Sequence, residues 1–343
     1  AVMDAGDARK TDEWINNVKV ALGGKNLDYI VCLHMEPDHA GSMMKAMETF
    51  PTAKVVGNAK TFTYMAQFFD VNLEGRKVEV KDGESLSLGE HNLTFVCAPM
   101  VHWPEVMVAY ESSEKVLFAA DAFGKFGAIS KYDGDWACEA RRYYFNICGK
   151  YGVQVQSLLK KAAALDIKTI APLHGPVLKE NLGYYIDLYN TWSSYGVESE
   201  GVLVAFASIH GNTRKAAEKI ASILEKQGAK KVVVSDLSRD DEAEVIEDAF
   251  RYGRMIIAAP TYDGGLFPPM ESFLSHLKSK NYQKRTVGII ENGTWAPMSG
   301  KLMKAALESM KEIKICDTVV TIKSALKAEQ EDSLVALAKE VLA

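Results

Sequence analysis

The 343-residue sequence has no long apolar run, no block of basic residues and no closely paired cysteines. Its longest apolar stretches, such as residues 202–207, are far shorter than the ~18 residues that a membrane span needs. The 45 acidic side chains outnumber the 40 basic ones, which gives a formal charge of −5. The sequence therefore predicts neither a membrane protein nor a nucleic-acid-binding protein.

Cysteine is also scarce, with five residues at positions 32, 97, 138, 148 and 316. The count is odd and no pair has C-x-x-C spacing, which excludes a zinc ribbon, a rubredoxin-type iron site and a disulfide framework. The first ten residues do not read as a secretory signal, because charged residues such as Asp4 and Lys10 interrupt them. We therefore expect reduced thiols and a cytoplasmic protein.

The chain length predicts two domains, and the sequence changes character near residue 197. Residues 1–197 mix short strands and helices irregularly, which suggests a sheet packed between helical layers. Residues 198–343 alternate strand and helix five times, which predicts a doubly wound parallel sheet. The first residues, Ala-Val-Met-Asp-Ala-Gly, read as the end of a buried strand followed by a turn. We therefore expect the first domain to be N-terminally incomplete.

The expected strand at residues 29–33 ends in a dense group of possible metal ligands. Within six residues stand His34, Glu36, Asp38 and His39, and Pro37 places a turn among them. Three further candidates, His102, Asp121 and His174, lie at or just beyond the ends of later expected strands. A single His or Asp at such a place is more often a capped or solvated residue. Four of the seven histidines fall in this one pattern, however, which favours a metal site.

Three loops of the second half indicate a binding site for a phosphorylated ligand. The first, Ser208-Ile209-His210-Gly211-Asn212-Thr213, joins a strand to a helix and offers hydroxyls and helix N–H groups to an anion. It lacks the residues of a nucleotide P-loop and of a dinucleotide fold, and it could simply be a capped helix start. The other two loops hold the candidates Pro260, Thr261, Tyr262, Asp263 and Gly264, and Asn292, Gly293, Thr294, Trp295 and Ala296. Both follow strands at the edge where doubly wound folds bind ligands, and each offers an aromatic ring to a flat cofactor.

The pattern H-x-E-x-D-H, followed by His, Asp and His, resembles that of the flavodiiron proteins, also called A-type flavoproteins. The resemblance covers nearly the whole chain and implies a metallo-β-lactamase-like αββα sandwich followed by a flavodoxin-like domain that binds FMN. It implies that His34, Glu36 and His102 hold one iron, that Asp38, His39 and His174 hold the other, and that Asp121 bridges them. A carboxylate at position 36, where the wider superfamily has His, suits iron or manganese better than zinc.

The resemblance also implies an activity and an assembly. An external donor, commonly rubredoxin or another small carrier and in some archaeal relatives a deazaflavin, would reduce FMN. The flavin would pass electrons to the diiron site, which would reduce dioxygen to water or nitric oxide to nitrous oxide. A head-to-tail homodimer, or a dimer of such dimers, would place the flavin of one chain beside the irons of its partner. Many relatives have Asn where this chain has Asp263, and the added anion predicts a lower flavin potential.

Two other functions stay open at this point. The first is a zinc hydrolase of the metallo-β-lactamase type fused to a flavodoxin domain, against which Glu36 argues. The second is a plain electron carrier whose first domain has lost catalysis, against which the complete ligand set argues.

Overall fold

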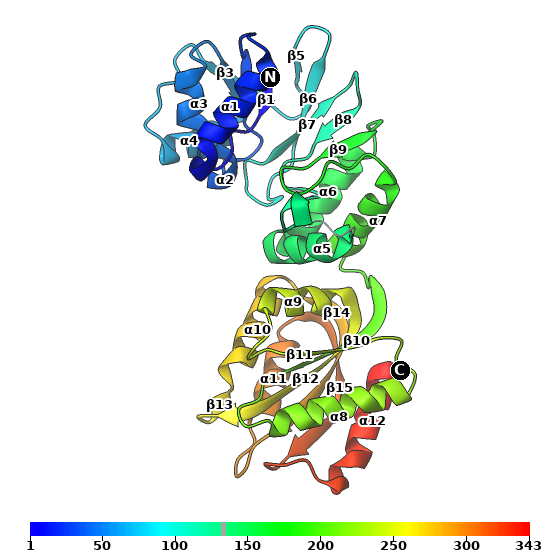
Figure 1. The fold of residues 1–343 in the computed structure, drawn as a ribbon. Coiled ribbons are helices and arrows are strands. Elements are labelled where there is room, and N and C mark those ends of the chain that lie inside the picture. The colour runs from blue at the N-terminus through cyan, green and yellow to red at the C-terminus, as the bar shows by residue number, and fades with distance from the viewer. Residues whose placement is uncertain (132–134) are drawn as a thin grey trace. The chain divides into compact units, whose positions relative to one another are not determined.

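The computed structural model describes residues 1–131 and 135–343. Contacts between residues divide the chain into two compact units. The first consists of Ala1–Ala140 and Val153–Asn190, and the second of Arg141–Gly152 and Thr191–Ala343. Figure 1 colours the chain from blue at its N-terminus, in the first unit, to red at its C-terminus, in the second.

The first unit contains two sheets. One is built from the parallel strands β1 (Val2–Met3), β2 (Tyr29–Val31), β3 (Lys54–Gly57) and β4 (Lys77–Glu79). The other has the order β5 (Ser85–Ser87), β6 (Asn92–Cys97), β7 (Met107–Glu111), β8 (Val116–Phe118) and β9 (Thr169–Ala171). It is antiparallel except for its last pair, β8 with β9.

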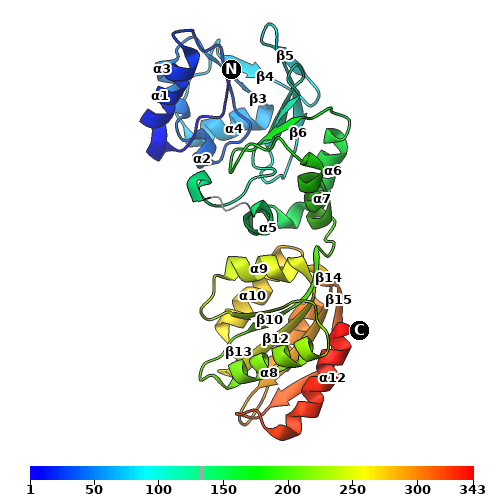
Figure 2. The same ribbon diagram turned by 45° about the vertical axis from the view of Figure 1, so that its right-hand side comes forward.

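Helices cover the outer faces of both sheets, as Figure 2 shows. They are α1 (Thr11–Leu22), α2 (Pro37–Ala40), α3 (Met43–Thr49), α4 (Ala59–Phe68), α6 (Gly152–Ala162) and α7 (Leu182–Ser193), with α5 (Trp136–Ile147) running on into the second unit. Apolar side chains of α1, α3 and α4 pack on β2 and β3 in one core. This is the αββα arrangement expected from the sequence.

The second unit is a parallel sheet with helices on both faces. Its strands run in the order β11 (Val232–Asp236), β10 (Ser199–Phe206), β12 (Tyr252–Tyr262), β14 (Gln283–Asn292) and β15 (Lys311–Ile322). The two-residue strand β13 (Gly265–Leu266) pairs with the end of β12. The helices α8 (Asn212–Lys226) and α12 (Glu331–Leu342) form one core with the sheet, and α9 (Glu242–Arg251), α10 (Pro268–Ser279) and α11 (Ser299–Glu308) cover the other face (Figure 1). The predicted doubly wound sheet is therefore confirmed.

Three differences from the expected elements have identifiable physical reasons. Helix α1 and strand β3 were not expected, although α1 spaces its apolar residues for a helix and ends at Gly23, which has φ 55°. The apolar spacing of residues 135–150 predicts a single helix, but α5 ends at Ile147 and a short 3-10 turn, Gly149–Tyr151, follows. The sequence predicts strands over residues 255–259 and 317–321, whereas β12 and β15 begin earlier because they pair with their neighbours beyond these runs, as Gln283 does with Lys311. Among the described residues, no helix is long and apolar enough to cross a membrane.

The second half of α5 belongs to the core of the second unit. Phe145 is almost fully buried and stacks on Phe250 of α9, with ring centroids 4.1 Å apart. Arg141 is also buried and donates to the carboxylates of Glu198 and Glu247. The expected boundary between residues 197 and 198 therefore leaves out a segment that packs with the flavodoxin-like sheet.

Replacing Phe145 with Ala should destabilise the second unit, although the residue lies more than 50 positions before its first strand. Removing a buried aromatic side chain costs about 3–5 kcal/mol. Hydrogen exchange followed by mass spectrometry should show faster exchange in peptides from β12 and β14. The exposed Phe68→Ala serves as the control and should change neither region. Unchanged protection in residues 199–343 of the Phe145 variant would contradict the role given to α5.

Candidate metal centre and flavin cavity

The first unit gathers seven possible metal ligands at the ends of its strands. His34 and Glu36 follow β2, and the next turn forms α2, where Pro37 occupies the first helical position. The remaining ligands are Asp38 and His39 on α2, His102 between β6 and β7, Asp121 after β8 and His174 after β9. All seven residues singled out from the sequence are thus brought together by the fold.

These side chains form two groups, each compact enough to hold a metal ion. The first group is His34, Glu36, His102 and Asp121, and the second is Asp38, His39 and His174. In each group one ligand atom per residue lies within 4.8 Å of every other. The division is the one that the resemblance implies for two irons.

Asp121 faces both groups with different oxygens. Its Oδ2 lies 3.0 Å from His102 Nε2 and 3.4 Å from His34 Nε2. Its Oδ1 lies 3.0 Å from His39 Nε2 and 3.5 Å from His174 Nε2. Ala120, just before it, has φ 50°, a strained conformation for a residue with a side chain. A carboxylate in this position can bind two metal ions at once.

The charges of the cluster stabilise one another without a metal. Burial alone would lower the pKa of His34, but its bonds to the Glu105 and Glu36 carboxylates raise it to about 10. Bonds from His102 and His34 lower the pKa of Glu36 to about 2. Burial would raise the pKa of Asp121, but the hydrogen bonds of His102 and His39 hold it below its usual range. The carboxylates that favour a proton on His34 would favour a metal cation at the same imidazole in the same way.

One carboxylate oxygen of the second ligand group indicates that these side chains suit a metal ion better than hydrogen bonds among themselves. Oδ1 of Asp38 is buried and has no hydrogen-bond partner among the described residues. A buried, unpaired carboxylate oxygen is costly unless something positive binds it. The mixed carboxylate and imidazole set suits iron or manganese.

Two buried carboxyls that were not predicted from the sequence hydrogen-bond to His34 and to the residues beside it. Glu105 Oε1 lies 2.7 Å from His34 Nδ1 and accepts the Met35 N–H at 2.9 Å. Asp4 accepts the N–H groups of Leu33 and His34, and burial raises its pKa to about 7. Carboxylates behind a ligating imidazole fix which nitrogen faces the metal. Neither residue stands in a motif, so only the tertiary contacts identify them.

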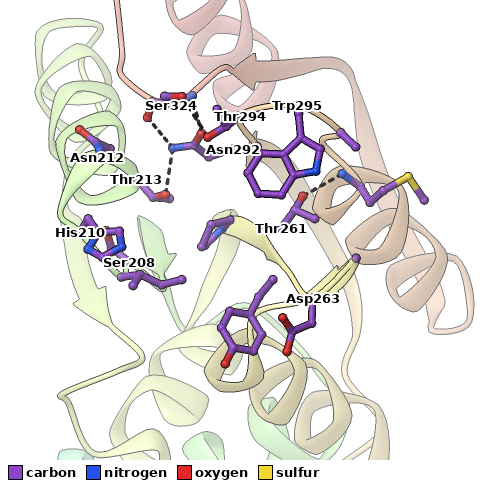
Figure 3. A pocket seen from close by; sticks show the side chains of 17 residues that line it. Ser208, His210, Asn212, Thr213, Thr261, Asp263, Asn292, Thr294, Trp295 and Ser324 are labelled. Carbon is purple, nitrogen blue, oxygen red and sulfur yellow. Dashed lines mark hydrogen bonds between the residues drawn. The ribbon is translucent and has the colours of Figure 1, made fainter.

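The second unit carries a cavity of about 480 Å³ at the carboxyl ends of its strands, shown in Figure 3. All the residues expected to bind FMN line it except Gly211, which has φ 84° and precedes α8. Two further residues, Met298 and Ser324, were not expected. Ser324 follows β15, so the rule that ligands bind at strand ends could have found it. The volume is in the range of small-molecule sites.

The hydroxyl groups of the cavity are oriented by backbone N–H donors. Ser208 Oγ accepts the Gly211 N–H at 3.0 Å. Thr261 Oγ1 accepts from Met298 and Ser299 at 2.8 and 3.1 Å, which joins the loops after β12 and β14. Because each oxygen already accepts, its own proton is free to point at a bound ligand. The cavity therefore offers donors to an acceptor-rich group such as a phosphate.

The tip of the β12–β13 hairpin brings Asp263 to the cavity. Tyr262 pairs with Gly265, so Asp263 (φ 48°) and Gly264 (φ 71°) form a two-residue turn with positive φ angles. Trp295, in the loop after β14, is 91% exposed beside the cavity. An aromatic side chain on this rim can cover the face of a flat ring.

Comparisons with known proteins agree with both halves of this geometry. Residues 1–175 match the model of the ODP family beta lactamase, which is just over half of the chain, and residues 203–320 match a flavodoxin domain. The chain belongs to the ODP family. Its combination with a flavodoxin domain is the architecture of the flavodiiron proteins.

Individual relatives cover most of the chain. The nitric oxide reductase of Moorella thermoacetica is 28% identical over 97% of this chain and 84% of its own. Among solved structures, the rubredoxin oxygen:oxidoreductase of Desulfovibrio gigas has a TM-score of 0.90 at 24% identity, covering 99% of this chain and 86% of its own. The flavodiiron protein of Giardia intestinalis has a TM-score of 0.92 at 22% identity, with the same coverage. These structures support the two-domain fold.

Replacing Asp121 with Asn should weaken metal binding at both groups. The change keeps the size but removes the charge from a carboxylate that faces both, so the affinity of each should fall by at least about tenfold. His174→Ala should affect only the second group. Metal analysis and iron Mössbauer spectra of the purified variants provide the measurement.

Glu111→Gln is a matched control for Asp121→Asn, because Glu111 is a buried carboxylate that belongs to neither group. Full occupancy of both positions in the Asp121 variant, with loss in the His174 variant, would show that Asp121 does not bridge.

Proposed function

We propose that this chain is a flavodiiron oxidoreductase that passes electrons from an external donor through FMN to a diiron site, where dioxygen is reduced to water, nitric oxide to nitrous oxide, or both. The observation that carries this proposal is the pair of ligand groups that share Asp121. A cytoplasmic location is part of the proposal, in keeping with an odd number of cysteines and no C-x-x-C pair.

In this proposal His34, Glu36 and His102 hold one iron, Asp38, His39 and His174 hold the other, and Asp121 bridges the two. The bound irons would supply Lewis acidity and single-electron chemistry. Glu36, Asp38 and Asp121 place three negative charges against the two cations. The His34 ring is held between Glu36 and Glu105, at 3.2 and 2.7 Å, so its orientation is set before a metal binds.

The cavity of the second unit would hold FMN, with its phosphate at the Ser208–Thr213 loop. The N-terminus of α8 and the hydroxyls of Ser208 and Thr213 offer donors to that anion. Tyr262 and Trp295 lie on the two loops that would flank the flavin ring. Dioxygen needs four electrons to become water, and a protein with one FMN and two ferrous ions stores that number.

The names of relatives support reduction of either gas and a small protein as the electron donor. One relative is named a nitric oxide reductase and one solved structure a rubredoxin oxygen:oxidoreductase. We therefore propose rubredoxin or another small carrier as the donor. The three carboxylates among the seven ligands argue against the rival zinc hydrolase. Hydrolysis also needs no flavin, so this rival leaves the flavin cavity unexplained.

Paired turnover measurements test the function directly. The protein, reduced through a small donor, should consume dioxygen, nitric oxide or both, and it should contain about two irons and one FMN per chain. Dioxygen should be converted to water rather than to hydrogen peroxide, because the electrons stored in one chain suffice. A preparation that contains stoichiometric zinc and no flavin, and that hydrolyses a thioester or a lactam, would overturn the proposal.

We further propose a head-to-tail homodimer in which the flavin of one chain serves the irons of its partner. Exposed apolar side chains at the rim of the cavity support this idea. Trp295 is 91% exposed, and Ile209 and Tyr262 are each close to half exposed. Such a rim favours contact with another protein surface, and a two-fold arrangement completes two sites at once.

Two inactive variants should then rescue each other. One carries His102→Ala and Asp121→Ala, and the other carries Asn212→Ala and Thr213→Ala in the flavin loop. Mixed dimers would contain one intact pair of sites, so coexpression should restore about a quarter of the parental turnover if the chains mix at random. Turnover that stays at the level of either variant, with mixed dimers confirmed by mass, would dispose of transfer between chains.

A further inference from the structure

Asn292, the last residue of β14, contacts two other segments of the flavin cavity through one buried amide (Figure 3). Its Nδ2 donates to the Ser324 carbonyl at 2.9 Å, and its Oδ1 accepts the Ser324 N–H at 3.1 Å. The same Nδ2 lies 3.4 Å from Thr213 Oγ1, in the first turn of α8. The amide thus connects the loop after β15 with the helix that begins beside the cavity.

The two bonds to Ser324 fix which way the Asn292 amide points. A flipped amide would place its oxygen against the Ser324 carbonyl and its NH₂ group against the Ser324 N–H, which loses both bonds. Ser324 has φ 72°, a left-handed conformation in which its N–H and carbonyl both face Asn292. The orientation of the amide is therefore determined by the backbone of another loop.

This orientation determines the role of the Thr213 hydroxyl. An amide NH₂ group can only donate, so Thr213 Oγ1 must accept from it. The single hydroxyl proton of Thr213 is then left to donate elsewhere. Thr213 is 2% exposed and lines the cavity, so a ligand bound there can accept this proton.

We propose that Asn292 is a positioning residue that sets the Thr213 hydroxyl as a donor to the phosphate of FMN, and that this contact helps the site to select a phosphorylated flavin over riboflavin. The inference rests on the proposed FMN site but not on the diiron chemistry. Among the described residues that line the cavity there is no Lys or Arg. Apart from the His210 imidazole, recognition of the phosphate dianion therefore depends on hydroxyl and backbone N–H donors, and each donor must be correctly oriented.

The test compares the dissociation constants of FMN and riboflavin for the full-length protein after flavin removal, measured by quenching of flavin fluorescence. Asn292→Asp is nearly isosteric and keeps the bond to the Ser324 N–H, but its carboxylate draws the Thr213 proton to itself. Asn292→Ala removes the amide without adding charge. The Asn292→Ala variant should bind FMN about tenfold more weakly, and Asn292→Asp should bind it more weakly still. The dissociation constant of riboflavin should change by less than about twofold in both variants.

A second comparison shows whether the effect passes through Thr213. In a Thr213→Val background, which has no hydroxyl to orient, Asn292→Ala should no longer change the ratio of the two constants. Thr213→Ser keeps the hydroxyl and should keep the ratio. Asn281→Asp, a matched change at the end of α10 outside the cavity, should affect neither flavin.

The FMN and riboflavin dissociation constants together show whether Asn292 acts on the phosphate contact or on the loops in general. Equal weakening of FMN and riboflavin in the Asn292 variants would overturn the inference, because Asn292 would then support the loops in general. An unchanged ratio would overturn it as well, and so would a loss that persists in the Thr213→Val background. If the parent protein binds neither flavin, the proposed FMN site fails instead. Should Asn292→Ala not fold, Asn292→Asp gives the comparison when it is also measured in the Thr213→Val background, where the repulsion by the carboxylate remains but there is no hydroxyl to orient.

Discussion

The sharing of one carboxylate between two groups of imidazoles constrains the whole first unit. Asp121 can face His102 and His39 at 3.0 Å with opposite oxygens only if the ends of β2, β6 and β8 converge, and the end of β9 adds His174. The two sheets meet this requirement because β2 ends beside β7, where Met107 N–H donates to the Leu33 carbonyl at 3.1 Å. Each ligand is then carried by a loop whose start is fixed by a paired strand. A shift of one strand by a single residue would turn its ligand away, because side chains alternate between faces.

The same cluster explains why so much charge is buried around it. His34 is fully buried between Glu105 and Glu36, and Asp4 accepts two backbone N–H groups just behind it. Buried ion pairs of this kind rarely add stability, since desolvation offsets much of their attraction. Their retention makes sense if they hold imidazoles in the orientation that a metal needs. Metal binding then contributes to the stability of the fold as well as to its chemistry.

The sequence predicted features that are encoded within a short stretch of residues better than contacts between residues far apart in the chain. The H-x-E-x-D-H run and the alternating second half are local patterns, and they predicted four of the metal ligands and the doubly wound sheet. His102, Asp121 and His174 were predicted from their places at strand ends, and the αββα sandwich from the family resemblance. Glu105 could not be anticipated, because its partner His34 lies 71 residues away and the two meet only when β2 packs beside the loop before β7. Ser324 follows β15 and could have been found from the rule that ligands bind at strand ends, but its bonds to Asn292 depend on a left-handed backbone conformation that no motif marks. Helix α1 was a different case, because its apolar spacing and Gly23 cap were visible in the sequence.

The flavin cavity solves the opposite electrostatic problem from the metal centre. The metal centre gathers carboxylates that can bind cations, whereas the cavity offers hydroxyls and backbone N–H groups that would bind an anion. Asp263 is the one acidic lining residue of the cavity among those described. The two-residue hairpin turn accepts Asn as readily as Asp, because both tolerate positive φ angles. The turn therefore does not require the negative charge at Asp263. A carboxylate beside a flavin ring would disfavour the reduced flavin anion. Because the backbone does not require this carboxylate, it can lower the flavin potential without changing the shape of the turn.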